Sequence, residues 1–147
     1  MDTDTGFTHS PVEILDVATC WDLLGRRTVG RLAVSIAGQP DIFPVNYVVD
    51  GQSLVFRTAE GSKLLAASLG GRMAFQVDEW AHEGAVSVLA HGTPHVMEGE
   101  ERESATSLEL GPWVPTHKEH WVRLEVDEVT GRRFRFGPEP EPFHPVG

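Results

Sequence analysis

Residues 42–69 read IFPVNYVVDGQSLVFRTAEGSKLLAASL, and this stretch decides how the rest of the chain is interpreted. Two runs rich in Val, Ile, Phe and Tyr lie on either side of Asp50-Gly51. Such a pair favours a tight β-hairpin, because both residues tolerate positive φ and glycine does so at no steric cost. The residues after the second run indicate a short helix that begins at Ser62. We therefore expect a strand, a two-residue turn, a second strand and a helix.

The junction between the second strand and this helix collects groups that suit an anion. Arg57 and Thr58 end the strand, and Ser62 and Lys63 begin the helix. The exposed N–H groups and the positive dipole end of a helix N-terminus favour a phosphate in such a place. The simpler alternative is that Arg57 pairs with Glu60 at the surface and Lys63 is a solvated helix residue. The spacing alone leaves both readings open.

The first strand is interrupted by the segment Pro44-Val45-Asn46-Tyr47. Proline and asparagine weaken a strand ladder, so another interaction should compensate for them. Two explanations are open. The segment is an edge strand, or a flat heteroaromatic ligand exchanges hydrogen bonds with it.

Composition excludes several classes of protein. The 147 residues, of which 40% are apolar and 23% charged, predict one soluble globular domain. No window approaches the roughly eighteen apolar residues of a membrane span, and the start lacks a signal-peptide core, so we expect a cytoplasmic location. A net charge of −10, from 12 basic and 22 acidic residues, disfavours nucleic acid and anionic membranes as partners.

The residues that most often bind metals or act as nucleophiles show no matching pattern. Cys20 is the single cysteine, which excludes an internal disulfide and a cysteine-based zinc site. His91 and His95 would lie about 13 Å apart on one face of a strand, which is too far for one ion. No metal is expected. The chain also lacks a G-x-S-x-G elbow, which argues against a serine hydrolase.

The remaining pattern predicts a small antiparallel barrel, because closure of about seven strands removes exposed edges. Residues 1–11 are expected to form a flexible arm, 12–137 the folded domain and 138–147 a proline-rich tail. The expected helices, besides the one at Ser62, are Asp16–Leu24 and Glu100–Leu110. The other expected strands are Gly30–Ile36, Met73–Asp78, Ala85–Met97 with a bulge or bend near Gly92 and Pro94, and a final hairpin of Trp121–Val126 and Arg132–Phe136 around Thr130-Gly131.

Three motifs occur in order along the chain: Gly30-Arg31-Leu32-Ala33, then Ile42–Tyr47, then Val55–Ala59 with Gly61–Leu64. Taken together they resemble the pyridoxamine 5′-phosphate oxidase-like family of flavin-binding split barrels, and in particular its short actinobacterial-type members. The similarity runs from about Val12 to Phe136. It implies a mainly β, Greek-key split β-barrel with two or three short helices. It also implies a homodimer with two cofactor sites at the subunit interface.

The resemblance further implies which residues bind the cofactor, FMN. The phosphate would be held by Arg57, Thr58, Ser62 and Lys63. The ring would lie along Pro44, Val45, Asn46 and Tyr47, with Phe56 and Ala59 nearby and Gln76 within reach. Trp113 and Trp121 would close the site, in part from the partner subunit.

One departure from the family restricts the expected function. Arg132–Phe136 runs into the proline tail without the C-terminal arginine-rich motif that grips the vitamin phosphate, so vitamin B6 oxidation is not expected. We expect an FMN-binding oxidoreductase that transfers a hydride or electron pair to a small organic acceptor. The alternatives are an F420 (deazaflavin)-dependent reductase and a flavin- or haem-binding module without turnover. No catalytic acid or base is assigned, although Tyr47 and nearby histidines are candidate proton donors.

Overall fold

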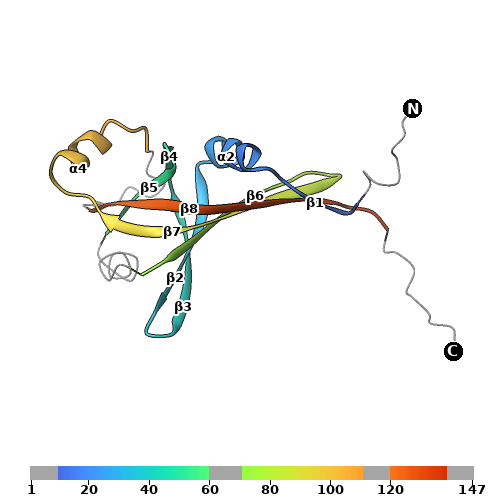
Figure 1. Cartoon of the computed structure of the whole chain (residues 1–147), viewed down its shortest axis with the longest axis horizontal. Coiled ribbons are helices and arrows are strands. Elements are labelled where there is room, and N and C mark those ends of the chain that lie inside the picture. Colours follow the sequence, from blue (N-terminus) through green and yellow to red (C-terminus); the bar gives the residue numbers. More distant parts are fainter. Residues whose placement is uncertain (1–9, 60–70, 111–119, 139–147) are drawn as a thin grey trace.

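The computed structural model describes residues 10–59, 71–110 and 120–138, which form one curled antiparallel sheet with two helices (Figure 1). The strands pair in the order β3-β2-β6-β7-β8-β5-β4, and β1 adds to β8. The predicted mainly β split-barrel architecture is confirmed. The elements are β1 (Val12–Ile14), α2 (Val17–Arg26), β2 (Val29–Ile36), β3 (Gln39–Asn46), β4 (Val48–Asp50), β5 (Ser53–Thr58), β6 (Met73–Trp80), β7 (Gly84–Val96), α4 (Gly99–Ala105) and β8 (His120–Arg135).

Strand β8 connects the two halves of the sheet. Its 16 residues pair with β7 over most of their length, with β5 at the beginning and with β1 at the end. The predicted hairpin around Thr130-Gly131 is therefore wrong. Gly131 lies inside the strand opposite Val88, and a Cβ atom on it would lie 2.6 Å from the Cys20 sulfur. The glycine is needed because α2 packs closely against the strand, and not because the chain turns.

A bulge interrupts the pairing of β7 with β8. His91 and Gly92 are neighbours in β7, but they lie opposite Glu128 and Val126, which leaves Asp127 as an extra residue in β8. Two guanidinium nitrogens of Arg72 bind the Asp127 carboxylate at 2.7 and 2.8 Å. The predicted bulge near Gly92 is confirmed, with the extra residue in the partner strand.

The interior of the barrel is apolar because alternate residues of each strand face it. Helix α2 begins where predicted, since the Asp16 carboxylate accepts a hydrogen bond from the Thr19 N–H at 2.8 Å. Its buried residues Cys20, Leu23 and Leu24 belong to the same core as the strands. The largest strand residues in this core are Leu32, Leu54, Phe56, Phe75 and Leu124.

The hairpin predicted around Asp50 forms, with its turn one residue later than expected. Asp50 pairs with Ser53, so the turn residues are Gly51 and Gln52, and Gly51 has a φ of 64°. The first strand of the hairpin is divided into β3 and β4 at Tyr47, whose N–H donates to the Thr28 carbonyl.

The ends of β6 and α4 differ from the prediction. β6 continues through Glu79 and Trp80, which the sequence places in a loop, because both residues pair with β7. α4 ends at Ala105 instead of Leu110. The helix expected at Ser62 lies outside the described residues. In the described ranges, each helix is too short or too polar to cross a membrane.

Gly131→Ala is expected to lower the free energy of unfolding by about 1–3 kcal/mol, because the added methyl group overpacks the contact with Cys20. Gly25→Ala is the matched control. Gly25 lies in α2, a Cβ atom there meets nothing within 4 Å, and alanine favours a helix by up to about 1 kcal/mol. Urea unfolding measures both. If Gly131→Ala is as stable as the wild type, the Cys20 contact does not constrain β8.

Candidate functional site

The hydrogen-bonded ladder of the barrel is interrupted between β3 and β5, and we call this place the β3–β5 break. β4 pairs with β5 from Val48–Val55 to Asp50–Ser53, and the described part of β3 does not continue this ladder. β3 nevertheless approaches β5, with Cα atoms of the two strands within 8 Å. Extending the same register by two residues would set Asn46 opposite Arg57. In that register two predicted site residues, Asn46 and Arg57, would flank the break.

Side chains at the end of β5 alternate between the two faces of the sheet. Phe56 and Thr58 are buried, and Thr58 Oγ1 donates to the Ala59 carbonyl at 2.9 Å. Arg57 lies on the other face, with its guanidinium carbon 5.1 Å from the centre of the Trp121 ring, a cation–π distance. The structure thus brings Arg57 and Trp121 together and separates both from the side chains of Phe56 and Thr58. Three predicted residues lie outside the described ranges: Ser62, Lys63 and Trp113.

A row of side chains crosses the outer face of the barrel from β3 to β8. Arg31 of β2 is paired with Pro44 on one side and Gln76 on the other, and Leu89 and Thr130 continue the row. Arg31 Nη1 donates to Gln76 Oε1 at 2.9 Å. The predicted residues Pro44 and Gln76 therefore share this face, with Arg31 between them. Sequence reasoning assigned no role to Arg31, although it is a charged residue within an apolar strand motif.

The Gln76 amide has partners on both of its polar atoms. Its oxygen accepts from Arg31, and its nitrogen donates to Ser87 Oγ at 3.0 Å and to Asp78 Oδ2 at 3.1 Å. Arg31 Nη1 also lies 3.3 Å from Asp78 Oδ2. These bonds fix the orientation of the amide. The Arg31 side chain stays half exposed, so this row presents a guanidinium to solvent.

Val45 and Tyr47 belong to the buried core. The Tyr47 ring packs edge-on against Phe75 with ring centres 4.6 Å apart, and its hydroxyl donates to the Leu24 carbonyl at 2.5 Å. Burial raises the pKa of Tyr47 well above its ordinary value. A role for the Tyr47 hydroxyl as a proton donor to a ligand on the outer face does not hold.

The sequence profile described as pyridoxamine 5′-phosphate oxidase matches residues 16–133. This range includes the β3–β5 break and the whole outer row. The chain belongs to the pyridoxamine 5′-phosphate oxidase family. The resemblance predicted from the three motifs is confirmed.

Several relatives of this family member come from actinobacteria. An uncharacterized protein of Mycobacterium tuberculosis is 39% identical over 95 residues, which cover 64% of this chain and 86% of that protein. The FAD-binding protein of Mycobacterium smegmatis is 37% identical, with a TM-score of 0.73 and coverage of 84% of this chain and 98% of the other. A conserved protein of unknown function from Corynebacterium diphtheriae is 38% identical, with a TM-score of 0.73 and coverage of 85% and 99%. Each of these similarities covers most of the relative's own length.

In this member of the pyridoxamine 5′-phosphate oxidase family, helix α4 packs beside Trp121. Ala105 of the helix forms a small buried cluster with Val55, Met97 and Trp121. The Met97 N–H also donates to the Trp121 carbonyl at 2.8 Å. The helix therefore supports the ring on which Arg57 lies.

Arg123 connects α4 to the β4–β5 hairpin. Its Nη1 donates to Asp50 Oδ2 at 2.9 Å and to Ser53 Oγ at 2.6 Å, and its Nε donates to Glu101 Oε2 at 3.0 Å. His95 Nε2 lies 2.8 Å from the same Glu101 oxygen. Burial alone would raise the pKa of Glu101, but the hydrogen bonds from His95 and Arg123 outweigh it and hold the pKa below its ordinary value.

The lowered pKa of Glu101 predicts a loss of stability in acid. Such a carboxylate stabilises the fold above its unfolded-state pKa, near 4.5, and this contribution disappears as the pH falls from there through the folded-state pKa. Glu101→Gln is expected to lower the thermal midpoint at pH 7 and to flatten its decline below about pH 4.5. Glu100→Gln, at an exposed position of the same helix, should keep the wild-type profile. Thermal midpoints between pH 3 and 7 test this, and a wild-type profile for Glu101→Gln would contradict it.

Proposed function

We propose that this chain is a flavin-dependent oxidoreductase that binds FMN on the outer face at the β3–β5 break. The observation that carries the proposal is the position of Arg57, stacked on Trp121 at the break in a member of the pyridoxamine 5′-phosphate oxidase family. The M. smegmatis relative binds FAD, which supports a flavin as the cofactor. We favour FMN because Arg57, Ser62 and Lys63 are close in sequence and suit a single terminal phosphate.

The residues on this face have the chemistry that a flavin requires. The planar Arg57 guanidinium suits bidentate contact with a phosphate, and Asn46 across the break offers an amide for ring atoms. The Phe56 and Thr58 side chains are buried, so any contact from these two residues would pass through the backbone. A bound flavin supplies the two-electron chemistry, and the protein supplies its position and hydrogen bonds.

The proposed reaction moves a hydride or electron pair between the flavin and a small organic acceptor. Arg31 lies in the same row as Pro44 and is half exposed. It offers a second guanidinium on the outer face, which suits an acceptor that carries a carbonyl or carboxylate group.

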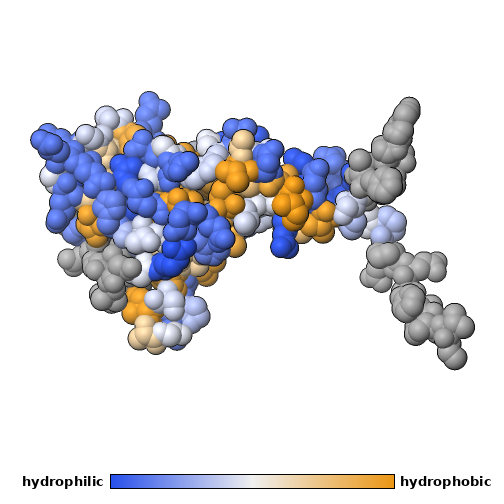
Figure 2. All heavy atoms as spheres, viewed as in Figure 1, coloured by the Kyte–Doolittle hydropathy of each residue, from blue (hydrophilic) through white to orange (hydrophobic). Residues whose placement is uncertain are grey.

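We further propose that the site lies at the interface of a homodimer. Ile42 and Leu89 lie on the same outer face as Arg31, and 64% and 36% of their surface is exposed in the single chain. Figure 2 shows apolar residues at the surface along the β2–β3 hairpin. A second copy would remove this apolar surface from water and enclose the polar row.

Charge reversal at Arg57 tests the cofactor site. Wild-type protein is incubated separately with FMN, FAD and F420 and then desalted, and the FMN sample is expected to keep the two-banded absorption spectrum of the flavin. Arg57→Glu should weaken FMN binding by about 100-fold or more, because a charge-assisted contact is lost and a repulsion is added. Arg26→Glu, a matched change on α2, should bind like the wild type. FMN binding by Arg57→Glu at wild-type affinity would show that the phosphate lies elsewhere, and retention of F420 alone would favour a deazaflavin reductase.

Charges introduced into the outer face test the dimer. Sedimentation equilibrium is expected to give a dimer for the wild type. The double variant Ile42→Glu with Leu89→Glu should dissociate at least about tenfold more readily and bind FMN more weakly, because buried unpaired carboxylates oppose association. Val17→Glu, at an exposed apolar position of α2, is the control and should stay dimeric. An unchanged dimer in the double variant would place the interface on another surface.

A further inference from the structure

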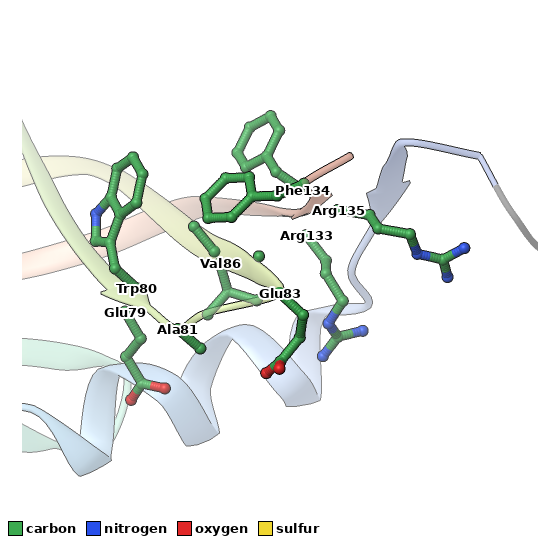
Figure 3. A pocket seen from close by; sticks show the side chains of 11 residues that line it. Glu79, Trp80, Ala81, Glu83, Val86, Arg133, Phe134 and Arg135 are labelled. Carbon is green, nitrogen blue, oxygen red and sulfur yellow. The ribbon is translucent and has the colours of Figure 1, made fainter. Parts of the chain in front are cut away.

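A pocket of about 550 Å³ lies at the far end of β8 from Trp121, between the β6–β7 turn and the last residues of β8. Its aromatic wall consists of Trp80, Phe134 and Phe136, and we call the pocket the aromatic slot. The Trp80 and Phe136 rings lie 5.7 Å apart, centre to centre, at an angle of 32°. Figure 3 shows Trp80 and Phe134 on the side of the strands that faces away from helix α2. Trp80 is 72% exposed and Phe136 is 44% exposed, so the slot presents aromatic surface to water.

Hydrogen bonds hold the walls of the slot in place. The Phe136 N–H donates to the Glu83 carbonyl at 2.9 Å, which ties the end of β8 to the β6–β7 turn. The turn itself is closed by the Ala81 N–H, which donates to the Gly84 carbonyl at 2.8 Å. On the other edge of β8, the Arg135 N–H donates to the Pro11 carbonyl at 2.9 Å. The slot is thus a preformed surface on three strands, as binding sites for small or extended ligands usually are.

The chain that follows the slot has the composition of a ligand for such a surface. Residues 137–147 read GPEPEPFHPVG. Proline fixes its own φ, and each residue before a proline is kept out of the helical region, so this sequence favours a polyproline II helix. With three residues per turn, one face of that helix would carry Pro140, Phe143 and Val146. Grooves lined by aromatic rings bind polyproline II segments, because little conformational entropy is lost on binding.

The direction of the tail argues against binding to its own slot. Phe136 is part of the slot wall, and an extended tail moves away from it by about 3.1 Å per residue. Gly137, Glu139 and Glu141 all precede prolines, which disfavours the tight turn needed to return.

Charge also favours the tail as the occupant. The end of β8 carries Arg132, Arg133 and Arg135 in a chain with a net charge of −10, and the tail carries Glu139 and Glu141. Arg132 is exposed and lies two residues before Phe134, on the same face of β8, whereas Arg133 points to the opposite face and pairs with Glu13.

We propose that the aromatic slot binds the proline-rich tail, residues 138–147, of a second copy of this chain. The tail would lie with Pro140 and Phe143 against Trp80 and Phe136, and its glutamates near Arg132. The proposal requires a second copy but no flavin, so it stands or fails independently of the cofactor site.

A synthetic peptide of residues 137–147 tests whether the slot binds this sequence. The peptide is titrated into ¹⁵N-labelled protein truncated after Gly137, and the Trp80 indole N–H resonance is followed, after assignment by Trp80→Phe. We expect this resonance to shift and to saturate. A peptide with Pro140→Ser, Phe143→Ser and Val146→Ser should bind at least about tenfold more weakly. A Trp80 resonance that does not move with the native peptide would overturn the proposal.

A mixing experiment tests whether the tail comes from a second copy. The labelled tail-less chain is mixed with unlabelled full-length Trp80→Ala, which carries a tail but an incomplete slot. We expect the Trp80 resonance of the tail-less chain to move to its peptide-bound position. Unlabelled Trp80→Ala truncated after Gly137 is the matched control and should leave the resonance unmoved. If the resonance stays at its free position in the mixture while the wild-type chain shows the bound position, the tail occupies its own slot and the assignment to a second copy is wrong.

Discussion

The pairing of β8 with three other strands is the interaction on which the rest of the structure depends. β5 bonds to its first residues and β1 to its last, while β7 follows the opposite edge. Because one extended segment carries all these ladders, a slip of β8 by one residue would exchange the inner and outer faces in both halves of the barrel. The core beneath α2 and the surface around Trp121 are therefore set by one register.

Local signals explain what could be predicted from the sequence, and distant contacts explain what could not. Asp16 caps α2 through a residue three positions away, and such a signal is visible in the sequence. The turn of the β4–β5 hairpin lies one residue later than the sequence predicts. Asp50, which ends the first strand of this hairpin, binds Arg123, a residue distant in sequence. The sequence predicts a turn at Gly131 because the contact that requires a glycine there is not local. Its neighbour Cys20 is distant in sequence, and only the folded chain brings the two together.

In the candidate site, too, the sequence identifies a segment but not the contacts that its side chains make. The motif Phe56-Arg57-Thr58 identifies the right segment, but the alternation of a strand sends only Arg57 to the outer face. A family resemblance identifies positions in a sequence and does not by itself give the direction of each side chain. The hydrogen bond from Arg31 to Gln76 joins neighbouring strands that are separated by a large part of the sequence. It follows from the strand order, which the motifs do not contain.

The extra residue at Asp127 has a consequence for which changes of chain length the protein can accept. Trp121 and Phe134 are separated by an odd number of positions, so in a regular strand their side chains would point to opposite sides. The bulge leaves Asp127 without a ladder position of its own, so the separation along the ladder is even and both side chains lie on the outside of the barrel. Deletion of Asp127 would give a regular ladder with an even number of positions between Trp121 and Phe134, so both side chains would still lie on the outside. β8 can therefore lose one residue at the bulge without exchanging its inner and outer faces, whereas a one-residue change elsewhere would exchange them over the segment between the change and the bulge.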